Sequence, residues 1–139
     1  MNVAIVYWSG TGNTEAMAMA IANSVKKNGA EADLIQCSSF DASKMDAYDA
    51  IAFGCPAMGA EELEDSEFLP MFEGCKAKLN GKKIALFGSY GWGDGEWMRN
   101  WEDECRSLGA NLVAEGLICN EAPDDAGIAN CEELGLKLA

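Results

Sequence analysis

Short apolar runs alternate with helix-like segments along almost the whole of this 139-residue chain. Such alternation indicates βαβ units, in which helices join parallel strands and cover both faces of the sheet. We expect strands at Val3–Trp8, Ala32–Cys37, Ala50–Gly54, Lys83–Gly88 and Asn111–Cys119. Periodicity predicts helices over about Asn13–Asn28, Ser66–Lys78 and Ala126–Leu138, and another whose shared face holds Met98, Trp101, Cys105 and Leu108.

The expected fold class is α/β: a doubly wound three-layer sandwich around a five-stranded parallel sheet. The length fits one domain, which we expect to span residues 1–139. In such folds ligands bind outside the carboxyl ends of the strands, where the strand order reverses. Three unusual loops follow the first, third and fourth strands, so all three should open on this one edge of the sheet.

The composition excludes several classes of function. The chain has 23 acidic and 10 basic residues, and its net charge of −13 disfavours nucleic acid and membranes and favours basic partners. It contains no histidine, which removes the usual zinc, haem and histidine-base chemistries, so we expect no metal site and no catalytic residues. The six cysteines are dispersed without a C-x-x-C pair, and most of them are expected to be reduced and buried. No apolar run approaches a membrane span, and the first residues resemble a buried strand, so we expect a cytoplasmic protein.

The loop after the first strand carries donors suited to a phosphate. Its hydroxyl and amide side chains can donate hydrogen bonds, its two glycines let the backbone approach a ligand, and the helix start adds a partial positive charge. The pattern is neither a Walker loop nor G-x-G-x-x-G, because no Lys-Ser/Thr follows and Glu15 replaces the third glycine. The alternative is an ordinary capped turn. The candidate residues are Ser9, Gly10, Thr11, Gly12, Asn13 and Thr14.

The loop after the third strand places a thioether beside a glycine and a run of acids. In Cys55–Glu62, Met58 could cover one face of a flat heterocycle, and Gly59 can adopt a positive φ angle. The alternative is a capped entry to the next helix, with Glu61 and Glu62 near its start.

The loop after the fourth strand, Ser89–Gly95, sets two aromatic side chains among three glycines. Glycines give no apolar cover, so Trp92 or Tyr90 should be partly exposed unless a planar ligand stacks on it. The alternative is a core tryptophan that anchors a mobile loop. Trp97 and Trp101, at helical spacing, are expected to pack in the core or at its edge and not to contact a ligand. Together the three loops describe a site for a phosphorylated, flat aromatic ligand.

Four segments of the chain closely resemble the short-chain flavodoxins of anaerobic bacteria: Tyr7–Glu15, Gly54–Gly59, Glu61–Phe68 and Leu86–Met98. The similarity runs along essentially the whole chain. The uninterrupted stretch from Gly109 to Asn120 leaves no room for the insertion found in long-chain members. The resemblance implies FMN as the cofactor and a sheet with strand order 2-1-3-4-5.

The resemblance also implies roles for individual residues. Ser9–Thr14 would bind the FMN phosphate, while Met58 and Trp92 would lie on opposite faces of the isoalloxazine ring. The Gly59–Ala60 peptide would turn its carbonyl towards flavin N5, and Glu61 would contact the N3 side. At the position of Ala60 the family often has a short polar residue.

Two further segments complete the expected site. The residues after the fourth strand would line the pyrimidine side or its entrance, and the loop after the fifth strand would approach the flavin. The FMN-binding residues implied outside the phosphate loop are Pro56, Ala57, Met58, Gly59, Ala60, Glu61, Ser89, Tyr90, Gly91, Trp92, Gly93, Asn120 and Glu121.

The function implied is that of a monomeric, low-potential carrier of single electrons, without enzymatic activity of its own. Five acids between Glu61 and Glu67 flank the expected flavin edge, so we expect redox partners with basic docking faces.

Two alternatives belong to other classes. An NAD(P)H-dependent flavin reductase acting on quinones would need a substrate cavity and a nicotinamide site, and no segment is left to build them. A phospho-receiver domain needs acids at the ends of the first and third strands. Those ends read Tyr7-Trp8-Ser9 and Phe53-Gly54-Cys55.

Overall fold

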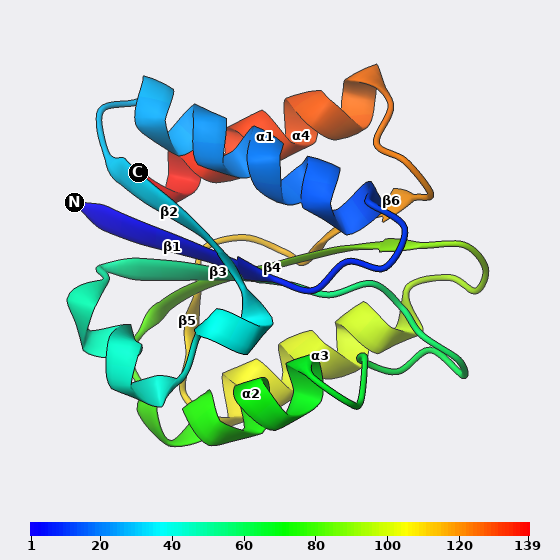
Figure 1. Cartoon of the computed structure of the whole chain (residues 1–139), viewed down its shortest axis with the longest axis horizontal. Helices are drawn as coiled ribbons and strands as arrows, with labels where there is room; N and C mark the ends of the chain where they lie inside the picture. Colours follow the sequence, from blue (N-terminus) through cyan, green and yellow to red (C-terminus); the bar gives the residue numbers. More distant parts are fainter.

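The structure, a computed structural model that describes all of residues 1–139, has three layers with one sheet in the middle (Figure 1). Every strand pairing is parallel, and the strand order is β2-β1-β3-β4-β5, with β6 also paired to β4. This order confirms the doubly wound fold expected from the sequence. The strands are β1 (Asn2–Tyr7), β2 (Glu31–Gln36), β3 (Ala50–Gly54), β4 (Lys83–Tyr90), β5 (Asn111–Leu112) and β6 (Leu117–Asn120).

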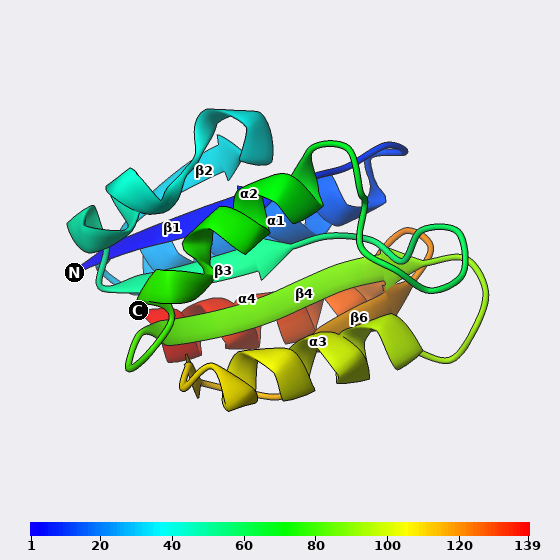
Figure 2. The same cartoon turned by 90° about the horizontal axis from the view of Figure 1, so that it is seen from below.

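Two pairs of helices cover the two faces of the sheet (Figures 1 and 2). Helices α1 (Asn13–Lys27) and α4 (Asp125–Leu138) pack together on one face, and α2 (Phe68–Cys75) and α3 (Glu96–Ser107) lie on the other. None of these helices combines the length and the hydropathy that crossing a bilayer demands. The short 3₁₀ helices are η1 (Cys37–Ser39), η2 (Ala42–Ala47) and η3 (Lys76–Lys78).

Each strand contributes to two separate cores because its side chains alternate between the faces. In β1, Val3 and Ile5 pack under α1 and α4, whereas Ala4 and Val6 pack with the side chains of α2 and α3. A sheet buried on both faces requires continuous apolar strands, which is why the central strands could be recognised in the sequence. All six cysteines are buried and free, whereas the sequence led us to expect this of most of them.

The fifth position of the sheet corrects the expectation of one continuous strand over Asn111–Cys119. Strand β5 pairs Leu112 with Ile84, and β6 resumes with Leu117 opposite Phe87. Residues 113–116 therefore lie opposite only residues 85 and 86 of β4, so this part of the chain bulges out of the sheet by two extra residues. Close packing against α3 accompanies the bulge, because a Cβ atom on Gly116 would lie 2.4 Å from the sulfur of Met98.

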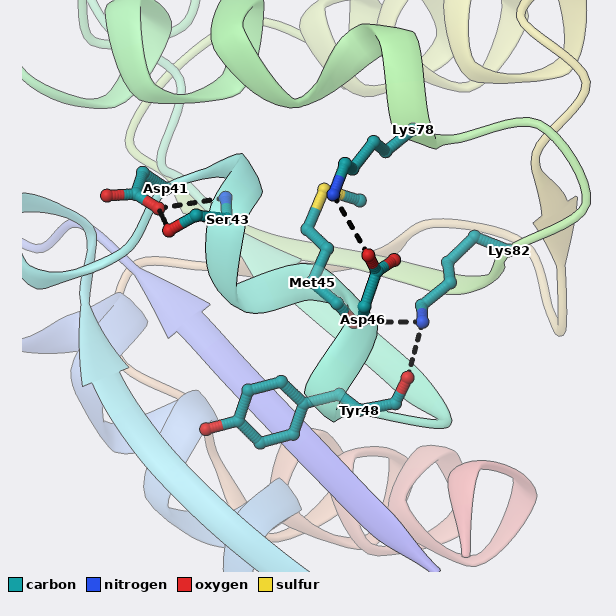
Figure 3. Close-up of polar contacts among 7 residues, drawn as sticks. All are labelled: Asp41, Ser43, Met45, Asp46, Tyr48, Lys78 and Lys82. Atoms are coloured by element: carbon teal, nitrogen blue, oxygen red, sulfur yellow. Dashed lines mark hydrogen bonds and ion pairs between the residues drawn. The ribbon is translucent and has the colours of Figure 1, made fainter.

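A lysine secures the connection between β2 and β3 at the amino ends of the strands (Figure 3). Lys82 Nζ donates to the main-chain oxygens of Met45, at 2.9 Å, and of Tyr48, near the end of η2. Lys78 pairs with Asp46 at 3.0 Å on the same connection. Since these contacts lie at the amino ends, they leave the carboxyl edge of the sheet to the three loops that were predicted to form the site.

Candidate functional site

A cavity of about 480 Å³ opens at the carboxyl edge of β1, β3 and β4. This edge includes the gap between β1 and β3, where the strand order reverses and where doubly wound folds bind ligands. The loops after the first, third and fourth strands meet there, as the sequence predicted. The cavity is lined by Trp8, Ser9, Gly10, Thr11, Asn13, Thr14, Pro56, Ala57, Met58, Ser89, Tyr90, Gly91, Glu121 and Ala122.

The loop between β1 and α1 presents unpaired donors to the cavity. Ser9 Oγ accepts hydrogen bonds from the Gly12 and Glu15 amides, at 3.1 and 3.2 Å, so its own hydrogen remains available. Gly12 adopts φ of 93° at the start of α1 and has no side chain with which to cap the helix. These features make an anion site built from neutral groups and a helix start. Its free main-chain donors are the amides of Gly10, Thr11, Asn13 and Thr14.

A pair of hydroxyl groups joins this loop to the end of β4. Thr14 Oγ1 lies 2.7 Å from Ser89 Oγ, and it also accepts from the Ser89 amide at 3.3 Å. Both side chains are buried and line the cavity. Because only one hydrogen can lie between the two oxygens, the other hydroxyl hydrogen is free to meet a ligand.

The loop after β3 is a short hairpin. The amides and carbonyls of Met58 and Glu62 exchange hydrogen bonds of 2.8 and 2.9 Å. Between them, Gly59 and Glu61 have φ of 52° and 55°, in the left-handed region. Met58 lines the cavity, but the tip of the hairpin, which includes Ala60, lies outside the lining.

Glu61 is engaged with a helix and not with the cavity. Its Oε1 accepts hydrogen bonds from the amides of Gly95 and Glu96, both at 3.2 Å, at the start of α3. Gly93 makes room for this carboxylate, because a Cβ there would lie 2.4 Å from the same oxygen. The side chain of Glu61 thus replaces the cap that Gly95 itself cannot provide.

A different acid caps helix α2. Glu64 is only 6% exposed, and its carboxylate accepts from the amides of Glu67, at 2.7 Å, Phe68, at 2.8 Å, and Ser66, at 3.0 Å, and from the Ser66 hydroxyl. Burial alone would raise the pKa of Glu64, but these hydrogen bonds outweigh it and lower the pKa to about 2. Glu64 is therefore no surface charge, which corrects its place among the five acids expected to face a partner.

Of the two aromatic residues at and just after the end of β4, one lines the cavity and the other lies outside its lining. Trp92 is 65% exposed and lies outside the lining, whereas Tyr90 lines the cavity and packs on Trp97 with ring centroids 5.7 Å apart. Trp97 and Trp101 are each 2% exposed, so of the predicted core or edge positions both occupy the core. Glu121 also lines the cavity, with φ of 57°, and strain of this kind in a non-glycine residue is common at binding sites.

The structure therefore assembles most, but not all, of the expected site in one cavity. Two lining residues were missed. Trp8 directly precedes the loop after β1, and this position was the only sequence signal for it; in the structure its ring would lie 3.0 Å from a Cβ on Gly10. Ala122 has no distinctive chemistry and gave no signal. The expected residues that do not line the cavity are Gly12, Gly59, Ala60, Glu61, Trp92, Gly93 and Asn120.

A doubly wound parallel sheet with an anion cradle and an aromatic wall at its switch point defines a nucleotide- or flavin-binding α/β protein. The sequence profile of the flavodoxin family matches residues 5–135, and the chain belongs to that family. Flavodoxins bind FMN, and they are electron-transfer proteins and not enzymes.

Individual relatives agree with this assignment. The chain is 49% identical to the flavodoxin of Megasphaera elsdenii over 133 residues, which cover 96% of this chain and 95% of the relative. It is 47% identical to that of Clostridium beijerinckii over 135 residues, or 97% of each chain. The solution structure of the two-electron reduced M. elsdenii flavodoxin matches with a TM-score of 0.91 and 48% identity, covering 98% of this chain and 97% of the other.

Proposed function

We propose that this single-domain chain carries single electrons at low potential between redox proteins, through FMN bound non-covalently in the cavity at the carboxyl edge. The observation that carries the proposal is the cradle after β1. It offers free amides and a free Ser9 hydroxyl, and no Lys or Arg lines the cavity. A phosphate monoester fits such a cradle, since helix starts and neutral donors bind phosphate without a countercharge.

The rest of the cavity suits a flat ring. Met58 and Tyr90 give it apolar walls, and the exposed indole of Trp92 stands in the loop that continues from Gly91. A ring stacked on Trp92 would cover apolar surface that otherwise faces water, which favours binding. FMN supplies the one-electron chemistry when bound, and the protein supplies binding and electrostatics.

The acidic surface of the protein supports the proposal that its redox partners have basic docking faces. The net charge is −13, and Glu62 and Asp65 are exposed beside the hairpin that carries Met58. Neither side chain has a hydrogen-bonding partner within the protein. Complementary charge speeds association and selects orientation more than it raises affinity, which suits a transient carrier.

The test is the absorption spectrum of the FMN-loaded protein during stepwise reduction with dithionite. We expect two resolved one-electron stages, and their absence would contradict the proposal. Steady oxidation of NAD(P)H by the purified protein alone would instead favour a flavin reductase acting on quinones.

A further inference from the structure

The segment 55–64, which we term the β3–α2 arm, connects β3 to the turn before α2 and carries Met58 and Gly59. Its first part continues the sheet, because the Cys55 amide donates to Phe87 O at 3.1 Å and the Ala57 amide to Ser89 O at 3.0 Å. The hairpin bridge ties its middle, and Glu61 ties its tip to α3. These contacts leave the returning end of the arm, after residue 62, to be held by other means.

Glu64 holds that returning end. Its amide donates to the sulfur of Cys55 at 3.3 Å, so the last residue of the arm is bonded to the first. Its carbonyl accepts from the Leu69 amide at 2.9 Å, and its buried carboxylate takes up the donors of the turn that opens α2. One residue thus closes the arm on itself and fastens it to the helix.

Between these anchors, the Gly59–Ala60 peptide makes no hydrogen bond within the protein. This peptide is free although the arm is bonded at Cys55 and Ala57, at the Met58–Glu62 bridge, through the Glu61 carboxylate and at Glu64. A free peptide between fixed residues can adjust to a ligand without disordering its neighbours. A loosened arm would instead lose conformational entropy on binding, which would weaken the affinity for the ligand.

We propose that Glu64 is a positioning residue for the flavin site: its buried carboxylate anchors the β3–α2 arm and thereby sets where Met58 and the Gly59–Ala60 peptide meet FMN. This inference rests on the proposed function, because the arm is assigned to the flavin. Glu64 does not line the cavity and acts through the arm alone.

The first test is amide hydrogen exchange in the protein without FMN, comparing Glu64→Gln with Asp65→Asn. Both changes remove one negative charge at adjacent positions, but only Glu64 accepts hydrogen bonds, and the amide group of glutamine would point a donor at existing donors. We expect the Met58 and Glu62 amides to exchange about ten-fold faster or more in Glu64→Gln, and to be unchanged in Asp65→Asn. Equal exchange in the two variants would overturn the proposal.

The second test uses the FMN-loaded protein and the separation between its two one-electron potentials. Loss of charge shifts the potentials in both variants, so a narrower separation in Glu64→Gln than in Asp65→Asn reports on the arm. If Glu64 only stabilises the fold, the separations will match although Glu64→Gln unfolds more easily, and the proposal fails.

A milder variant keeps the proposal testable if Glu64→Gln does not fold. Ser66→Ala removes one hydroxyl donor and keeps the carboxylate and its charge. It should shift both readouts in the same direction as Glu64→Gln but by less, and no shift in either readout would count against the proposal. Failure of the carrier function itself would show separately, as absence of FMN binding by the wild-type protein while the amide exchange results still stand.

Discussion

Glu61 caps a helix that begins beyond Gly95, with its Oε1 3.2 Å from the Gly95 amide, although the two residues are 34 positions apart. Gly95 has φ of 92° and no side chain with which to cap α3 itself. The contact therefore joins the hairpin that carries Met58 to the loop that carries Trp92. Two walls of the proposed flavin site are held together before any ligand binds.

We expect Glu61→Ala to destabilise the protein without FMN by about 1 kcal/mol, the usual effect of losing a helix cap. Urea unfolding measures this change. Glu62→Ala is the matched control, since Glu62 is exposed and its side chain makes no hydrogen bond. Equal midpoints for the two variants would show that the cap contributes nothing.

The cradle after β1 predicts that FMN binds at least ~100-fold more tightly than riboflavin, since riboflavin lacks the phosphate to which the donors of the cradle would bond. Thr11 is exposed and lines the cavity, so Thr11→Ala should leave stability unchanged. It should weaken FMN binding about ten-fold and leave riboflavin binding unaffected. Fluorescence titration gives both affinities, and similar affinities for the two ligands would contradict the phosphate assignment.

Docking of a basic redox partner should weaken with salt, because exposed charges are screened over about 10 Å at 0.1 M ionic strength. Reversal of the exposed acids, as Glu62→Lys with Asp65→Lys, should slow electron transfer at low salt and leave it unchanged at high salt. Stopped-flow kinetics checks both effects. A rate that ignores salt and both reversals would mean that these acids only solubilise the protein.

Gly59 has φ of 52°, and a Cβ there would meet no atom within 4 Å, so a larger residue adds strain without a clash. Because this backbone conformation is already present without FMN, we expect Gly59→Val to destabilise the FMN-free protein by about 1–2 kcal/mol, the usual cost of left-handed strain. If the 59–60 peptide also turns on reduction, the separation between the two one-electron potentials should narrow as well. Potentiometric titration decides this, and an unchanged separation would leave Gly59 as a simple turn residue.

Glu64 makes stability depend on pH in a defined direction. Its pKa in the folded protein is about 2, below the ordinary value of 4.5, so the unfolded chain binds the proton first. Its contribution, at most ~3 kcal/mol, is complete above pH 4.5 and is lost as the pH falls through about 2. The difference in unfolding free energy between wild type and Glu64→Gln should shrink over that range, whereas a constant difference would refute the hydrogen-bonded carboxylate.

The central strands and the donor-rich loop after β1 were predictable because their signals are local. A strand buried on both faces must be apolar along its length, and a loop that binds phosphate with neutral groups needs hydroxyls, amides and glycines in succession. The bulge at residues 113–116 was not predictable, since the close approach of Gly116 to Met98 of α3 that accompanies it joins segments distant in the sequence.

The sequence by itself determined the doubly wound fold and the edge of the sheet at which the loops meet, because these follow from hydrophobic periodicity and parallel topology. It also determined which polar donors the loop after β1 can offer, because these are given by its residue types. Only the tertiary structure decided what each acid does. Glu61, Glu62 and Glu64 stand close together in the sequence as equivalent carboxylates, yet one caps α3, one is exposed and one is buried at the start of α2. An acid's role depends on which main-chain donors come within reach, and at Glu61 those donors come from another strand's loop, brought there by the packing of the whole chain.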